Sequence, residues 1–285
     1  MAVCALWGAA AGDDALLPQW AAPAGLAAAD ARRRQRGQSD VTDSPVPDET
    51  LIRADAVHKR FGGITAVDGV VFAARRGELV GLIGPNGSGK TTLVNLLTGH
   101  LAPDSGEIFL GGHQVTHLPA YRRARYGVGR TFQMSQLFRR MTVLENMLVP
   151  GLTFPHLSRE VIAARARAHL RFLGLNHLET LPARSLSGGQ QKLLELGRAL
   201  MLDPTLLLLD EPFAGVHPTL RDGIIERILQ LHASGRTFLI VDHDIEAIQQ
   251  LATRLVVMAR GRVIADGSPA DVRGNRAVLA AYAGT

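Results

Sequence analysis

The sequence holds little cysteine, little lysine and few aromatic residues. Its single cysteine, Cys4, excludes an intrachain disulfide and a cysteine-based metal cluster, and it favours a reducing, intracellular compartment. Lysine occurs only at Lys59, Lys90 and Lys192, so arginine supplies nearly all of the basic charge behind the net charge of +5. A basic chain of this kind suits phosphate ligands, nucleic acid or acidic lipid without choosing among them.

Long apolar runs are also missing. No stretch of about 18 apolar residues occurs, so we expect no transmembrane helix. The charge-free residues 15–29 contain Pro18 and Pro23 and follow two aspartates, so we expect no secretory signal there. Residues 1–48 combine alanine-rich, arginine-rich and proline-containing pieces without periodicity, which predicts a disordered N-terminal extension.

From about residue 49 to the end, strand-like and helix-like segments follow one another. The expected strands are 51–57, 70–74, 79–83, 106–112, 205–209, 237–241, 254–259 and 262–267. The expected helices are one that follows the glycine-rich turn after 79–83, and then 158–175, 187–202, 218–233 and 244–252. Strands that alternate with helices predict a mostly parallel α/β sheet.

Residues 84–92, GPNGSGKTT, match the pattern of a phosphate-binding loop. They follow an apolar strand-like segment and open a helix-like one, which is the context that this pattern requires. Glycines let the backbone wrap around a phosphate, and amides at a helix N-terminus favour anions. Lys90 would reach the β- and γ-phosphates, and the Thr91 hydroxyl would bind Mg²⁺. The predicted nucleotide-binding residues are Gly84, Pro85, Asn86, Gly87, Ser88, Gly89, Lys90, Thr91 and Thr92.

Residues 206–212, LLLLDEP, set two carboxylates directly after an apolar run. An NTP–Mg²⁺ site needs a carboxylate at the end of a neighbouring strand, the edge where doubly wound sheets bind ligands. Strand alternation sends Asp210 and Glu211 in different directions, so one can face the metal and the other the attacking water. Since burying charge is costly, we expect both acids to lie just past the end of the strand, outside the apolar core.

Between these motifs, LSGGQ at 186–190 is followed by QKLLELGRALMLDPTLLLLDEP. This segment resembles the signature helix and Walker B strand of ATP-binding cassette (ABC) ATPases. The resemblance covers about residues 51–283 and includes KRFGG, GRTFQ and IVDHD in the family's order. It implies an α/β fold, a P-loop NTPase cassette over 49–285. This cassette would have a RecA-like core sheet, an N-terminal antiparallel β subdomain and an inserted α-helical signature subdomain at about 134–200.

The resemblance also implies roles for single residues. Phe61 would stack on adenine. Glu211 would be the general base, and His243 would contact the γ-phosphate. The implied catalytic residues are Glu211, His243, Gln133 and Lys90. The implied metal-binding residues are Thr91, Gln133 and Asp210. The implied signature residues, which would face ATP held by another subunit, are Ser187, Gly188, Gly189 and Gln190.

The cofactors and partners follow from the same resemblance: ATP, Mg²⁺ and a second cassette in a head-to-tail dimer, with a heterodimer favoured. FGGITAVDGV, RTFQ with TVLEN, and the ending AVLAAYAG are similar to ATP-binding subunits of branched-chain amino acid importers. This implies an ATPase that drives uptake through two integral membrane permease subunits. It would lie peripherally on the cytoplasmic face of the membrane, served indirectly by a solute-binding protein and without nucleic acid. Residues 135–143 would seat a permease coupling helix.

Several alternatives stay open. His217 and Gly188 stand where the importer group usually has Asn and often has Tyr, so urea, short amides and aromatic acids are alternative solutes. LSGGQ together with Gln133 and His243 disfavours a small-molecule kinase. The short segment between Gln133 and Asp210 disfavours a non-transport ABC ATPase with long insertions. The intact Glu211 predicts hydrolysis rather than a cassette that only binds ATP.

Overall fold

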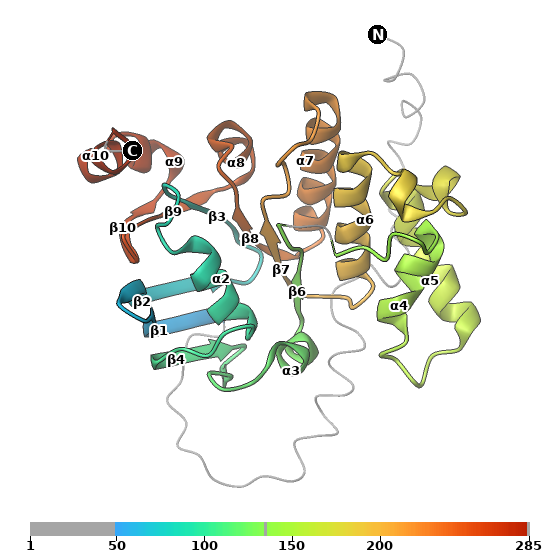
Figure 1. Cartoon of the computed structure of the whole chain (residues 1–285), viewed down its shortest axis with the longest axis horizontal. Coiled ribbons are helices and arrows are strands. Elements are labelled where there is room, and N and C mark those ends of the chain that lie inside the picture. The colour runs from blue at the N-terminus through green and yellow to red at the C-terminus, as the bar shows by residue number, and fades with distance from the viewer. Residues whose placement is uncertain (1–48, 134–135, 284–285) are drawn as a thin grey trace, which may run out of the picture. The chain divides into compact units, whose positions relative to one another are not determined.

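Two β-sheets and the helices around them make up the part of the chain that the structure describes, residues 49–133 and 136–283 (Figure 1). The structure is a computed structural model. The extension expected at residues 1–48 lies outside the described residues. Across the described ranges, no helix combines the length and apolar character that a membrane span requires.

The first sheet is antiparallel, in the order β2-β1-β4-β5. β1 (Thr50–Phe61) and β2 (Ile64–Arg75) form a hairpin, while β4 (Ser105–Leu110) pairs with the other edge of β1 and with β5 (His113–Gln114). Alternate side chains such as Ile52 are fully buried, because successive residues of a strand face opposite sides. This sheet confirms the predicted N-terminal antiparallel subdomain.

The second sheet has the order β10-β9-β3-β8-β7-β6 and is parallel except for the β9–β10 pair. Every residue of β3, β7 and β8 is buried, as expected for parallel strands that are covered on both faces. The strands are β3 (Leu79–Ile83), β6 (Val128–Arg130), β7 (Leu206–Asp210), β8 (Thr237–Val241), β9 (Arg254–Ala259) and β10 (Arg262–Gly267). The predicted parallel α/β sheet is confirmed.

Alternation along the buried strands divides the core in two. Leu206 and Leu208 pack with α2 (Lys90–Thr98) and the antiparallel sheet. Leu207 and Leu209 pack into the other cluster, with the helices of the opposite face. Those helices include α7 (Pro218–Ala233), α8 (Ile245–Leu251), α9 (Pro269–Arg273) and α10 (Arg276–Ala283).

Three further helices lie in the chain between β6 and β7 and pack on one another (Figure 1). They are α4 (Val143–Gly151), α5 (Arg159–Phe172) and α6 (Gly188–Leu200). Side chains of Thr142, Ser158 and Ser187 cap their N-termini. The expected helices 158–175 and 187–202 are thus present, each shorter at its C-terminal end. The remaining short helices are α3 (Ala120–Arg123), η2 (Ala124–Tyr126), η3 (Asn176–Leu178) and η4 (Ala183–Ser185).

Candidate functional site

The glycine-rich residues 84–89 connect β3 to α2 and form a tight turn. Gly84, Gly87 and Gly89 have φ angles of 150°, 74° and 102°, which side-chain-bearing residues rarely adopt. A Cβ at Gly84 would lie 2.1 Å from the Met258 carbonyl oxygen, whereas one at Gly87 would meet nothing within 4 Å. The N-terminus of α2 has no side-chain cap. Its first amides can therefore serve an anion on the open side of the loop.

Lys90 opens α2 and folds back over this loop. Its Nζ donates hydrogen bonds to the carbonyl oxygens of Gly84 at 2.7 Å and Pro85 at 2.9 Å. Burial lowers the pKa of Lys90, while the nearby carboxylates of Glu211 and Asp210 raise it. The ammonium group thus lies half-buried, and neutral carbonyls are its hydrogen-bond partners. A phosphate would be a stronger partner for this charge.

Asp210 is the last residue of β7 and is only 2% exposed, which corrects the expectation that it lies outside the core. Arg130, at the end of β6, makes this burial tolerable: its Nη2 lies 3.1 Å from Asp210 Oδ2. Burial raises the pKa of Asp210, and the Arg130 guanidinium lowers it. Arg130 was missed from the sequence, although a buried acid signals that a counter-ion is needed.

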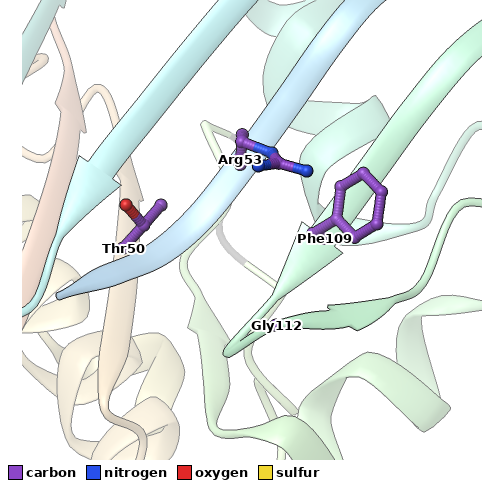
Figure 2. A pocket seen from close by; sticks show the side chains of 4 residues that line it. All are labelled: Thr50, Arg53, Phe109 and Gly112. Carbon is purple, nitrogen blue, oxygen red and sulfur yellow. The ribbon is translucent and has the colours of Figure 1, made fainter. Parts of the chain in front are cut away.

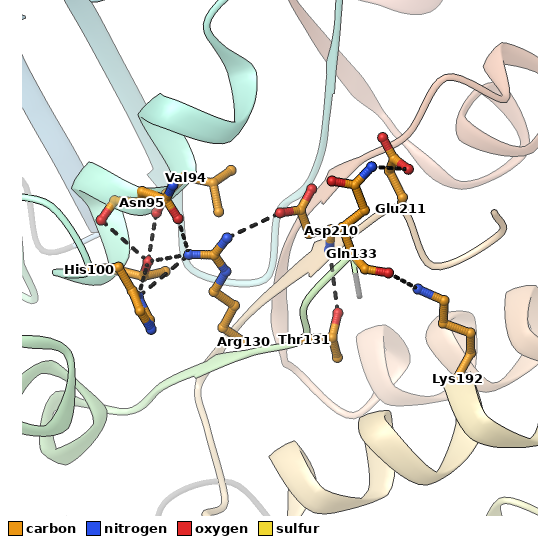
Figure 3. A network of polar contacts seen from close by, with 10 residues as sticks. Val94, Asn95, His100, Arg130, Thr131, Gln133, Lys192, Asp210 and Glu211 are labelled. Carbon is orange, nitrogen blue, oxygen red and sulfur yellow. Dashed lines mark hydrogen bonds and ion pairs between the residues drawn. The ribbon is translucent and has the colours of Figure 1, made fainter. Parts of the chain in front are cut away.

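Glu211 leaves the sheet in another direction, as Figure 3 shows. Its φ of 50° is left-handed, and its amide donates to the Val241 carbonyl at 2.7 Å. Gln133 Nε2 donates to Glu211 Oε2 at 3.0 Å, and Lys192 Nζ donates to the Gln133 carbonyl at 3.0 Å. The structure therefore brings Gln133 and Glu211 together, whereas Asp210 pairs with Arg130; the roles of these residues stay predictions.

His243 and Phe61 are both open to solvent. The side chain of His243 is 67% exposed, and its Nδ1 lies 3.5 Å from Asp242 Oδ1. Phe61 ends β1 and is 47% exposed, with the Lys59 ammonium 5.8 Å from its ring centre. An exposed ring beside a cation offers a stacking face for a base. The roles of both residues stay predictions.

The signature residues begin α6. Ser187 Oγ accepts from the Gln190 amide at 3.4 Å, and Gln190 Oε1 accepts from the Ser187 amide at 2.9 Å, a capping box. A Cβ at Gly189 would lie 2.8 Å from Leu220 Cδ1, so the missing side chain favours the close packing of α6 on α7. Within one chain, two amides of this helix start are thus satisfied by Ser187 and Gln190.

The oxygen donors at the site suit Mg²⁺ if phosphate oxygens of a nucleotide complete the coordination shell of the ion. Thr91, Gln133 and Asp210 supply a hydroxyl, an amide and a carboxylate, which are hard donors that Mg²⁺ accepts. Across residues 49–133 and 136–283, no group of three or more His, Cys, Asp or Glu residues could hold a metal alone. Such a donor set is typical of a metal bound together with a nucleotide.

A hollow lies on the antiparallel sheet (Figure 2). Arg53 and Phe109 line it together with Thr50 and Gly112, and the Arg53 guanidinium lies 4.4 Å from the Phe109 ring centre. Asp55 also contacts Arg53 Nε at 3.0 Å. Its one cation is thus already paired, and this hollow carries none of the chemistry of the phosphate loop.

Known proteins share this architecture and these motifs. The family described as ABC transporter matches residues 67–214. The chain belongs to the ABC transporter family. The family described as branched-chain amino acid ATP-binding cassette transporter also matches this cassette, over residues 262–282. The cassette is the ATP-binding, ATP-hydrolysing subunit of an ABC transporter.

Curated relatives resemble the cassette over almost their whole length. A probable branched-chain amino acid transport ATP-binding protein LivG of Archaeoglobus fulgidus is 39% identical, over 82% of this chain and 95% of the relative. The high-affinity branched-chain amino acid transport ATP-binding protein LivG of Escherichia coli (strain K12) is 37% identical, over 83% and 98%.

Solved structures agree. An ATP-binding cassette of an ABC transporter in its ADP conformation has a TM-score of 0.75 and 37% identity, covering 83% of this chain and 99% of its own. The dimeric post-hydrolysis state of another cassette, bound to ADP and Pi, has a TM-score of 0.71 and 26% identity, covering 76% and 98%. Nucleotide binding is therefore a property of this fold.

Proposed function

We propose that this cassette hydrolyses ATP to drive uptake of branched-chain amino acids through separate membrane permease subunits. The solute assignment is supported by the names of the relatives, which are 37–40% identical, and by the match over residues 262–282. One observation above all supports the hydrolysis mechanism: Gln133 donates to Glu211, and the carboxylates of Glu211 and Asp210 lie near enough to Lys90, on the phosphate loop, to raise its pKa.

The site residues divide the work in this proposal. The Lys90 side chain and the amides of Gly87, Gly89, Lys90 and Thr91 hold the phosphates. Thr91, Asp210 and Gln133 hold Mg²⁺, which when bound neutralises phosphate charge. Glu211 polarises the attacking water, and the bond from Gln133 fixes its carboxylate. The adenine ring stacks on Phe61, and His243 contacts the γ-phosphate.

The signature helix completes the site of a second cassette. Residues 187–190 start α6, and in the dimer their amides would face the γ-phosphate bound by the partner, in competition with the capping box. We favour a heterodimer with a paralogous cassette. Residues from about 134 to 200 act as the helical subdomain within a 49–285 domain, and residues 135–143 contact the permease. The assembly lies on the cytoplasmic face of the membrane and receives solute from a binding protein.

The Glu211→Gln variant tests both parts of this proposal. Purified, it should lose at least about 100-fold in kcat, because it lacks the base, while it still binds ATP and forms a lasting dimer. In a strain without the native gene, it should fail to restore leucine uptake, whereas the wild type and the exposed control Glu226→Gln should restore it. Phosphate release, gel filtration with ATP and labelled leucine uptake are the measurements.

Two results would contradict the proposal separately. Parental ATP turnover by Glu211→Gln would remove Glu211 from the role of base. Unchanged leucine uptake in the strain without the gene, together with lost uptake of urea or short amides, would overturn the solute.

A further inference from the structure

Arg130 lies between the phosphate-loop helix and the acid at the end of β7, as Figure 3 shows. It is the last residue of β6, the strand next to β7. Its side chain is 7% exposed, and the partner carboxylate of Asp210 is 3% exposed. A guanidinium so deeply placed is held by its contacts rather than by water.

The two ends of the guanidinium bind two different elements. Nη2 lies 3.1 Å from Asp210 Oδ2, on β7. Nη1 donates to Asn95 Oδ1 at 2.6 Å and to Thr98 Oγ1 at 3.0 Å, both on α2. Because the fork of an arginine is planar and rigid, it fixes the distance between its partners. Arg130 therefore ties α2 to the end of β7.

Neighbouring rings hold this fork in place. The Phe132 ring centre lies 4.9 Å from the Arg130 guanidinium carbon, and His100 packs edge-on against Phe132 with ring centres 5.4 Å apart. His100 Nδ1 also lies 2.9 Å from Thr98 Oγ1. The arginine thus has one packed conformation, as a rigid link requires.

The helix that Arg130 contacts, α2, also carries Thr91, a metal-binding residue of the proposed site. Asn95 lies about one helical turn after Thr91 on α2. Because Arg130 links Asn95 to Asp210, it also sets the distance between Thr91, on the same helix, and Asp210. Arg130 contacts Oδ2 of the carboxylate, so Oδ1 can serve another ligand.

We propose that Arg130 is a positioning residue, which sets Asp210 against Thr91 and thereby sets the affinity of the ATP site for a divalent cation. This inference rests on the proposed function, in which both residues bind Mg²⁺. Partners that orient a metal ligand change metal affinity by about 10- to 100-fold when they are removed. Arg130 would thus act on the cation and leave the metal-free nucleotide contacts alone.

The test is Mn²⁺ binding, followed by electron paramagnetic resonance, with the cassette saturated by a non-hydrolysable ATP analogue. Arg130→Met should weaken Mn²⁺ binding by about tenfold, whereas binding of the analogue in EDTA should change by less than about twofold. Arg130→Lys should also weaken Mn²⁺ binding, since a point charge cannot bridge both elements. Asn95→Ala, which removes only the anchor on α2, should weaken it less.

Arg236→Met is the matched control. The side chain of Arg236 is only 11% exposed and forms an ion pair with Asp203 at 2.9 Å. These two residues lie just before β8 and β7 begin, so they are at the opposite ends of the strands from Asp210. Its loss should leave Mn²⁺ affinity unchanged. If Arg130→Met fails to fold, Arg130→Lys and Asn95→Ala still decide the question.

Asp210→Asn separates this inference from the proposed function. If Asp210→Asn does not weaken Mn²⁺ binding, the proposed metal site itself is wrong. If Asp210→Asn weakens it, but the Arg130 and Asn95 variants bind Mn²⁺ as tightly as the wild type or more tightly, only the positioning role is overturned.

Discussion

Among single residues, Arg123 shows how the phosphate-loop helix ends. It is 1% exposed, and its guanidinium donates to the carbonyl oxygens of Leu96 at 2.6 Å and Leu97 at 2.9 Å, in the last turn of α2. It also donates to the carbonyls of Leu118 and Thr116. Burial lowers the pKa of Arg123 to about 10, so it stays charged near neutral pH. A cation at this end favours the helix dipole.

Arg123→Met should lower the free energy of unfolding by about 3 kcal/mol or more, because four hydrogen bonds to carbonyl oxygens are lost, three of them buried. Chemical denaturation of the purified cassette measures this change. The neighbouring Arg122 is exposed, so Arg122→Met should stay within about 0.5 kcal/mol of the wild type. Equal effects of the two variants would show that the carbonyl contacts of Arg123 add nothing to stability.

Among the elements, α6 contacts the backbone of both Gln133 and Gln136. Lys192 Nζ donates to the Gln133 carbonyl at 3.0 Å, and Glu195 Oε1 accepts from the Gln136 amide at 2.8 Å. Arg198 Nη1 donates to the Gln136 carbonyl. Side chains three residues apart on a helix share one face. The helix that begins with the signature residues, α6, thus fixes the backbone of Gln133 and Gln136.

Lys192→Met should lower kcat about five- to tenfold with KM for ATP within about twofold. The lost bond anchors Gln133, which orients Glu211, but leaves the phosphate loop untouched. Steady-state ATPase kinetics measure both constants. Lys192→Arg keeps a donor and should restore most of kcat. A raised KM with unchanged kcat would instead place Lys192 in nucleotide binding.

For the whole molecule, local signals predicted the elements that carry strong periodicity or clear ends. α7 occupies the predicted 218–233, because Pro218 suits a first helical position. β6 was not predicted: it has three residues, includes Gly129, and is defined by its pairing with β7 rather than by propensity. α4 was missed too, because Pro150 and Gly151 near its end obscure a helical pattern.

The phosphate loop and the acid pair could likewise be predicted, since each is a continuous motif with a fixed chemistry. The contact of Arg130 with Asp210 could not be, because it joins residues far apart in the chain. Only the strand order, which places β6 next to β7, brings them together. Burial of Asp210 follows from that contact, and for this reason the expectation of an exposed acid was wrong.

The global stability of the fold should depend on pH through His169. It lies on α5, is 1% exposed, and its pKa is lowered from 6.5 to about 3, by burial first and by Arg165 and Arg236 next. Between these two values the unfolded chain binds a proton that the folded chain does not. Stability is therefore fully present above pH 6.5 and is lost as the pH falls toward 3.

His169→Gln should remove this dependence. Between pH 7 and pH 5, the wild type should lose about 2 kcal/mol more unfolding free energy than the variant, since one proton is taken up on unfolding. Urea denaturation of both proteins across this range gives the two profiles. Their difference cancels every other titrating group, so it reports His169 alone. Parallel profiles would mean that folding does not change the protonation of His169, and that its burial has no part in the acid sensitivity of the cassette.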